Sequence, residues 1–416
     1  MTEFEVGDYV ELITNKDTFR GLVMPSNIFS EHDIIRLKLD NGYNIGVKIS
    51  KLVKVKVLQK GEKKEKRLDT KKIQFKDNYI SILGTGGTIA SYIDYKTGAV
   101  HPAETQEELL ISVPELSEKH RINSRIIFSI LSEDMKVSYW QTLAKEIVSE
   151  FNRGAKGVII PHGTDTMAYT AAALAFIIPD LAGPVSLVGA QRSSDRPSSD
   201  AYQNLLNTEA LMDTNLGEVV VTMHESISDN YSVIHRGVRV RKMHTSRRDA
   251  FKSINGTPIA KIKNGNVEFL KEYKQKVEGK IKVAEKMNDK VSILYYYPGL
   301  EVDHLKIIGD HVDGIIIMGT GLGHVGTYLI DTVRELTDSG KLIAMTSQCL
   351  FGAVNMNVYS SGRELIKAGV IPLGDMLPET AFVKMMWLLG NYSKEKARLL
   401  MPKNLRFELS EKRVLW

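Results

Sequence analysis

Residues 79–90 read YISILGTGGTIA, an apolar run that ends in a turn of glycine and threonine. Residues 157–178 read GVIIPHGTDTMAYTAAALAFII, where a second apolar run precedes another Gly-Thr turn and a helical pattern. Short apolar strands that alternate with helices are typical of a mostly parallel sheet covered on both faces. The two stretches therefore predict an α/β fold, with two polar turns at the carboxyl ends of strands, where they can converge.

The same alternation continues along the chain. Further strand-like runs are expected at residues 125–131, 184–190 and 217–223. A second set of strands starts near residue 291 with VSILYYYPG, GIIIMGTG and LIAMTSQC, and the charged stretch 270–290 is expected to join the two sets. We therefore predict two parallel-sheet α/β domains, an N-terminal one over residues 78–285 and a smaller C-terminal one over residues 286–416.

The first 60 residues have a different pattern. Four or five β-branched or alternating runs are joined by turn residues, among them Asn41-Gly42, which is a strong hairpin signal. The pattern predicts a small N-terminal β-barrel over residues 1–60. It carries no cluster of acids, bases or nucleophiles, so a docking role is expected. Residues 61–77 are polar and lysine-rich, as in a basic linker.

Composition places the chain among ordinary globular proteins. Of its 416 residues, 43% are hydrophobic and 25% charged, which excludes a fully disordered or fibrous protein. No apolar run reaches the ~18 residues that a membrane span needs, and the N-terminus lacks the pattern of a signal peptide. The single cysteine, Cys349, excludes an intrachain disulfide framework. We expect a cytoplasmic enzyme or enzyme subunit that has no contact with membranes.

The charge distribution is uneven. The net charge is only +5, but residues 48–76 carry 12 basic and 3 acidic side chains. Such a strip can attract a polyanion, but a solvated, lysine-rich linker is the preferred interpretation.

Two glycine-threonine turns are the main candidates for chemistry, because ligands of open α/β sheets bind outside the carboxyl ends of the strands. The turn at Thr85 lacks the Lys-Ser/Thr pair of a phosphate-binding loop, which leaves a hydroxyl nucleophile as one interpretation. In the second turn, Thr164 or Asp165 is also a plausible helix cap.

Two other patterns suggest ligands that we do not expect. The histidines His224, His235 and His244 match no metal-ligand spacing, so no metal site is predicted. The glycines of residues 321–326 fit a dinucleotide-binding pattern, but the next strand ends without the required acid. A tight turn beside the substrate cleft is the preferred interpretation of these glycines.

Together, these motifs resemble the L-asparaginase/glutaminase family of threonine amidohydrolases over roughly residues 78–400. Residues 85–90 resemble the first threonine signature of the family and residues 162–167 the second. Residues 132–135 resemble the segment that binds the substrate carboxylate, with a glutamate at position 133 in place of the family's glutamine. Residues 242–253 resemble the stretch with the catalytic lysine.

The resemblance implies a mechanism. Thr85 is expected to attack a side-chain amide and to form an acyl-enzyme, while Lys242 removes its proton directly or through the Thr164 hydroxyl. Asp165 is expected to hold the lysine or to accept the substrate ammonium group. Arg239 and Arg241 are expected to help keep the lysine uncharged if they point inward. The residues expected to bind substrate are Ser132, Glu133, Tyr95, Gly86 and Gly163.

A barrel, a basic linker and an amidohydrolase in this order resemble the D subunits of archaeal glutamyl-tRNA(Gln) amidotransferases. The resemblance implies that glutamine is hydrolysed here and that a partner E subunit uses the ammonia to convert Glu-tRNA(Gln) to Gln-tRNA(Gln). It implies no cofactor in this chain, ATP and Mg²⁺ in the partner, a homodimer within a heterotetramer, and contact with tRNA(Gln) mainly through the complex. A free-standing L-asparaginase with an accessory domain and a non-catalytic RNA-binding or scaffold protein are the alternatives.

Overall fold

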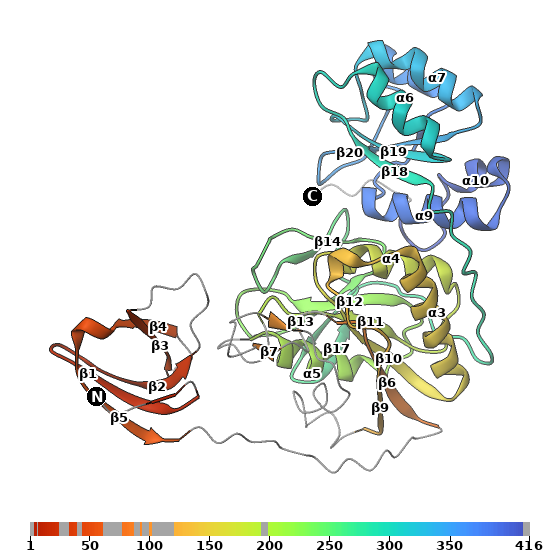
Figure 1. Cartoon of the computed structure of the whole chain (residues 1–416). Coiled ribbons are helices and arrows are strands. Elements are labelled where there is room, and N and C mark those ends of the chain that lie inside the picture. The colour runs from red at the N-terminus through yellow and green to blue at the C-terminus, as the bar shows by residue number, and fades with distance from the viewer. Residues whose placement is uncertain are drawn as a thin grey trace.

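The computed structural model describes residues 4–5, 7–24, 33–39, 44–60, 77–86, 92–93, 100–101, 120–192 and 199–410 (Figure 1). These residues form an N-terminal antiparallel sheet, a large central sheet and a smaller C-terminal sheet. None of the helices in these ranges combines the length and the apolar character needed to cross a membrane. Nearly all of the expected linker, residues 61–76, lies outside the described residues.

The N-terminal sheet has five antiparallel strands in the order β4-β3-β2-β1-β5. They are β1 (Tyr9–Thr14), β2 (Thr18–Met24), β3 (Ile34–Leu39), β4 (Asn44–Lys48) and β5 (Leu52–Gln59), with a 3-10 turn η1 (Ile49–Lys51) before the last. Residues such as Val10, Leu12 and Leu37 are fully buried in a core of their own. This sheet accounts for the short strands that the sequence predicted.

The central sheet has the order β17-β16-β13-β12-β11-β10-β6-β9. Its parallel part comprises β6 (Tyr79–Gly84), β9 (Ile122–Ile126), β10 (Ala155–Pro161), β11 (Val185–Val188) and β12 (Val219–His224). Helices α3 (Val137–Asn152) and α4 (Met167–Ile177) pack in one hydrophobic cluster and α5 (Ala201–Leu211) in another. The α/β fold with helices on both faces is thus confirmed.

Two features of the central sheet differ from the prediction. The strand expected at 125–131 is β9, which ends at Ile126, because the next two amides donate to the carbonyl of Gly84 and turn the chain out of the sheet. The sheet is also mixed, since its far edge is antiparallel. This edge consists of β13 (Ser232–Arg236), β16 (Ala260–Lys263) and β17 (Asn266–Phe269).

Short elements complete this half of the chain. A separate hairpin joins β14 (Val240–Lys242) to β15 (Phe251–Ser253), within a stretch where no strand was predicted. Another pairs β7 (Tyr92–Ile93) with β8 (Val100–His101). The 3-10 turn η3 (Ser132–Asp134) precedes α3.

The C-terminal sheet is parallel, in the order β18-β19-β20-β21. The strands are β18 (Val291–Tyr295), β19 (Gly314–Gly319), β20 (Leu342–Ser347) and β21 (Ile371–Pro372). The helices are α6 (Val302–His311), α7 (Ile330–Asp338), α8 (Ser360–Lys367), α9 (Pro378–Asn391) and α10 (Lys394–Leu400), with the 3-10 turn η4 (Thr327–Leu329). Helix α9 contacts both α4 and β19, so it packs the two α/β halves together (Figure 1).

Candidate active site

The loop after β6 is held against the neighbouring strand end. The hydroxyl of Thr85, a residue that is 2% exposed, donates to the carbonyl of Pro161 over 2.9 Å. Gly86 follows with a φ of +97°, and a Cβ on it would lie 2.3 Å from the carbonyl oxygen of Ile130. Only glycine fits both the left-handed backbone and the close approach. The Thr85 hydroxyl is therefore fixed at the carboxyl edge of the sheet.

The loop after β10 packs tightly against two other loops. A Cβ on Gly163 would lie 2.6 Å from the Cβ of Ser132, and the Thr166 hydroxyl donates to the Ser132 carbonyl over 2.6 Å. A Cβ on Gly189, in the loop after β11, would lie 2.7 Å from the Cγ2 atom of Thr164. The Thr164 loop is therefore packed between the loops that follow β9 and β11.

Lys242 completes this arrangement from a distant part of the sequence. Its Nζ atom donates to the Oγ1 atom of Thr164 and to the Oδ1 atom of Asp165, each over 2.8 Å. The lysine side chain is 15% exposed, whereas that of Asp165 is 66% exposed. The structure thus brings together three of the four residues predicted to be catalytic, and it places the fourth, Thr85, on the adjacent strand end.

This contact disfavours a capping role for the second turn. Helix α4 begins at Met167 with Thr166 at its N-cap, and the cap receives no side-chain hydrogen bond. Thr164 and Asp165 bind the lysine instead. A hydroxyl, an amine and a carboxylate within hydrogen-bond distance form a group that can pass a proton.

His162, at the start of the same turn, was not predicted from the sequence to have a role. It is completely buried, and its Nδ1 atom lies 2.6 Å from the carbonyl of Gly163. Burial lowers the pKa of His162 to about 4, although the bond to the carbonyl acts to raise it. The imidazole is therefore neutral near pH 7. The feature of the sequence that could have identified His162 is its position between an apolar strand and a Gly-Thr turn.

The remaining predicted substrate residues have different environments. Ser132 is buried and Glu133 is exposed, both in η3. Tyr95 lies outside the described residues, as do Gly87 and Thr88. Gly86 and Gly163 occupy the close approaches described above. The glutamate at position 133 is thus available at the surface beside the buried serine.

The two arginines that flank Lys242 do not support it as expected. Arg239 Nη1 lies 2.8 Å from Asp375 Oδ2, and Arg241 Nε lies 3.1 Å from Glu379 Oε1. They were expected to help keep the lysine uncharged only if they pointed toward it, and their guanidinium groups are directed to these carboxylates instead. Both pair with carboxylates of the C-terminal domain.

The three histidines considered as metal ligands have other partners. His224 lies 2.6 Å from Asn204 Oδ1, and His235 lies 2.8 Å from Ser253 Oγ. His244 accepts from backbone amides of the loop that follows it. Over the part of the chain that the structure describes, no three His, Cys, Asp or Glu side chains are grouped to hold a metal ion.

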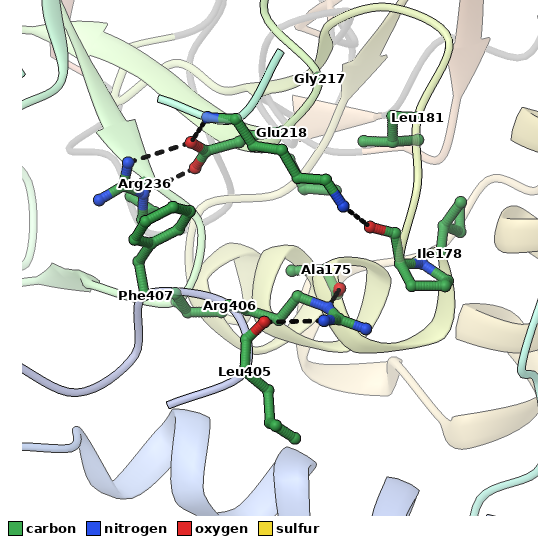
Figure 2. Close-up of a pocket in the computed structure, with 13 residues that line it drawn as sticks. Ala175, Ile178, Leu181, Gly217, Glu218, Arg236, Leu405, Arg406 and Phe407 are labelled. Atoms are coloured by element: carbon green, nitrogen blue, oxygen red, sulfur yellow. Dashed lines mark hydrogen bonds and ion pairs between the residues drawn. The ribbon is translucent and has the colours of Figure 1, made fainter. Parts of the chain in front are cut away.

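A small cavity of about 40 Å³ lies elsewhere, at the amino end of β12 (Figure 2). There Arg236 is bonded to Glu218 and lies over the ring of Phe407 at 4.1 Å. The site at the loops lies at the carboxyl ends of the strands, so the two are distinct.

Comparison with known proteins agrees with this geometry. Three family descriptions match the chain: "GatD N-terminal domain" at residues 4–58, "Asparaginase, N-terminal" at 79–275, and "Glutaminase/Asparaginase C-terminal domain" at 290–401. The D subunit of the glutamyl-tRNA(Gln) amidotransferase of Pyrococcus furiosus is 49% identical, covering 98% of this chain and 95% of that protein. The corresponding D subunit of Sulfolobus acidocaldarius is 48% identical, covering 98% and 92%.

Solved asparaginases share the same fold over most of the chain. The thermostable L-asparaginase from Thermococcus kodakarensis matches with a TM-score of 0.72 at 31% identity, covering 80% of this chain and 99% of that protein. L-asparaginase I from Vibrio cholerae matches with a TM-score of 0.70, also at 31% identity, with the same coverage. Each of these two structures leaves about a fifth of the chain unmatched.

Proposed function

The chain belongs to the family of glutamyl-tRNA(Gln) amidotransferase D subunits, and from that membership we propose that it is the glutaminase subunit of such an enzyme. It hydrolyses glutamine and releases ammonia, with which a partner subunit converts Glu-tRNA(Gln) to Gln-tRNA(Gln). The observation that carries the chemistry is the contact of Lys242 with Thr164 and Asp165 at the strand ends beside Thr85. The observation that favours an amidotransferase subunit over a free asparaginase is that residues 4–58 match the "GatD N-terminal domain" description.

The reaction is an acyl transfer in two halves. In the first, the Thr85 oxygen attacks the carboxamide carbon of glutamine while its proton passes through the Thr164 hydroxyl to the amine of Lys242. The tetrahedral intermediate then breaks its carbon–nitrogen bond, and the lysine returns the proton to the leaving nitrogen, which departs as ammonia. In the second, water attacks the threonyl ester and releases glutamate.

The surrounding loops stabilise the negative charge of the tetrahedral intermediate and bind the substrate. The backbone N–H groups of Gly86 or of Thr164 are the candidates to stabilise the oxyanion. The exposed carboxylate of Asp165 has two oxygens. One accepts a hydrogen bond from Lys242, and the other is free to accept one from the substrate ammonium group. The Ser132 hydroxyl binds the α-carboxylate of glutamine, whereas the adjacent Glu133, a carboxylate itself, is suited to the ammonium group and not to the α-carboxylate.

The assembly is proposed as two copies of this chain with two copies of the E subunit. ATP and Mg²⁺ act in the partner, and this chain needs no cofactor of its own. The isolated chain is a poor glutaminase, because enzymes that share an intermediate between subunits commonly couple turnover to closure.

The test measures ammonia release from glutamine by the chain alone and with an E subunit, ATP, Mg²⁺ and Glu-tRNA(Gln). We expect ammonia and Gln-tRNA(Gln) to form together in the complex. Equal rates with and without the partner would contradict the coupling. High turnover of asparagine by the isolated chain would instead support the asparaginase alternative.

The residue assignments are tested with Thr85→Ala, Thr164→Ala and Lys242→Ala. Each is expected to lower kcat by roughly 10³-fold or more with an unchanged circular dichroism spectrum. Mass spectrometry of the quenched reaction locates the ester. An ester on Thr164 instead of Thr85 would overturn the choice of nucleophile.

A further inference from the structure

The strand that carries Lys242 presents charged side chains to two sides. Successive side chains of a strand point to opposite faces, so Arg241 of β14 lies on the face opposite to Lys242, and Arg239 comes directly before the strand. The lysine faces Thr164 and Asp165, whereas the arginines face the C-terminal domain. The strand β14 is only three residues long, and among the described strands it pairs with β15 alone. It therefore forms no strand ladder with the central sheet, and its partner β15 is linked to that sheet through the bond of Ser253 to His235 of β13.

Arg239 makes the more buried of the two contacts. Its side chain is 8% exposed and its partner Asp375 is 12% exposed. The guanidinium also donates to the Phe407 carbonyl over 2.8 Å and to the Ser410 hydroxyl over 3.1 Å. Burial raises the pKa of Asp375, but the charge of Arg239 and the bonds from Ser410 outweigh it, so the pKa lies below the usual value. The carboxylate is ionised and fixed by several donors.

Arg241 makes the second contact, next to the helix that follows the Thr164 loop. Its partner Glu379 is 10% exposed and lies in the first turn of α9. Tyr169 of α4 lies close to both groups. Burial, and then the charge of Glu379, raise the pKa of Tyr169 to about 12, while the charge of Arg241 opposes this. A neutral tyrosine, a carboxylate and a guanidinium thus meet where α4, α9 and β14 join.

Further hydrogen bonds strengthen the same attachment. The Thr380 hydroxyl donates to the Val238 carbonyl over 2.9 Å, and the Asn255 amide donates to the Asp375 carbonyl over 3.1 Å. Residues 375–380, here called the carboxylate segment, therefore bind the chain both before β14 and after β15. The threonine turns differ, since they follow strands that lie within the central sheet.

We propose that the carboxylate segment of the C-terminal domain positions the catalytic lysine, through the ion pairs Arg239–Asp375 and Arg241–Glu379. The proposal rests on the proposed function, in which Lys242 is the base. The two arginines and the two carboxylates are positioning residues, since none of them contacts the reacting groups. Loss of a pair lets β14 shift relative to Thr164, and a misplacement of about 1 Å can cost about 100-fold in rate.

The test compares Glu379→Gln and Arg241→Gln with a charge-exchanged double variant, Arg241→Glu with Glu379→Arg, in the complete amidotransferase complex. The control is Glu285→Gln, which removes an ion pair between α3 and the connecting segment, where Lys145 lies 2.9 Å away. We expect both single variants to lower kcat by roughly 10-fold or more with little change in KM, and to move the acid limb of the kcat–pH profile. The double variant recovers a substantial part of the loss, and the control keeps wild-type values.

A second measurement follows the lysine without relying on activity. Lys242 and the exposed Lys306 are acylated in competition with a trace amine reagent, and the two peptides are quantified by mass spectrometry. The ratio of their rates is expected to change several-fold in Glu379→Gln and Arg241→Gln but not in Glu285→Gln. Variants whose kcat, pH profile and labelling ratio all match the wild type would overturn the proposal.

The two hypotheses can fail separately. If Lys242→Ala keeps near wild-type turnover, the base assignment fails, whatever the labelling shows. If Lys242→Ala is inactive while Glu379→Gln alters neither the labelling ratio nor the pH profile, the base stands and the positioning role is wrong. A variant with a lowered melting temperature is judged by the labelling ratio well below that temperature, where global unfolding does not contribute to the ratio.

Discussion

The fully buried His235 makes the stability of this protein depend on pH in a calculable way. It lies on β13, and its Nδ1 atom is 2.8 Å from the Ser253 hydroxyl of β15. Burial, and to a lesser degree the charge of Lys252, lower the pKa of His235 to about 3. The unfolded chain has a histidine pKa of about 6.5. Because the folded pKa is the lower one, stability is complete above about pH 6.5 and is lost as the unfolded state takes up protons below it.

The size of the loss follows from these pKa values. At about pH 5.5 the unfolded histidine is largely protonated and the folded one is not, which costs about 1.4 kcal/mol relative to about pH 7.5. His162, whose pKa is about 4, is expected to cost a similar amount. The wild type should therefore lose about 2.8 kcal/mol from these two groups, and His235→Gln about half of that.

The assay is urea unfolding followed by tryptophan fluorescence, for the wild type and His235→Gln at both pH values. Glutamine can still bond to Ser253, and other titrating groups are common to both proteins, so their effects cancel in the comparison. We expect the wild type to lose about 1.4 kcal/mol more than the variant on acidification. Equal losses would refute the assignment of a neutral, buried His235.

Two further substitutions probe the packing of the site and of the domain contact. Gly189→Ala places a methyl group 2.7 Å from Thr164 Cγ2 and should lower kcat by roughly 10-fold, whereas Gly256→Ala, with nothing nearer than 3.9 Å, should leave kinetics unchanged. A wild-type kcat for Gly189→Ala would show that Thr164 can move freely. Lys384→Met leaves Glu408, which is 0% exposed, without its cation and should cost about 3–5 kcal/mol of stability. A melting temperature within a degree or two of the wild type would contradict this expectation.

The sequence predicted the strands and both threonine turns because buried parallel strands have an unmistakable apolar pattern. It located β6, β10 and β12 closely. It misplaced β9. The apolar run continues beyond the end of this strand, where the amides of Ile127 and Phe128 donate to the Gly84 carbonyl. A hydrophobic pattern indicates which residues are buried, but it does not indicate which carbonyl accepts a hydrogen bond from a given amide.

In the site, too, the sequence predicted the local turns but not the contacts between residues far apart in the chain. The approach of Lys242 to Thr164 spans 78 residues, and only the family resemblance suggested it. The partners of the two arginines, Asp375 and Glu379, were not predicted, because they lie more than 100 residues further along the chain. Charge alone showed that Arg239 and Arg241 need partners. It did not show on which side of the strand the partners lie.

One helix connects both halves of the catalytic contact. Helix α9 packs on α4, which begins directly after the Thr164 loop, and its first turn holds Arg241 beside Lys242. Any displacement of α9 therefore acts on the threonine and on the lysine at once. The central sheet fixes Thr85 independently, through the bond to Pro161. On the proposal above, the seating of the C-terminal domain helps to set the position of Lys242 relative to Thr164. Ion pairs suit this role because their geometry is directional, whereas a hydrophobic contact of similar size, although it costs less to bury, is not directional.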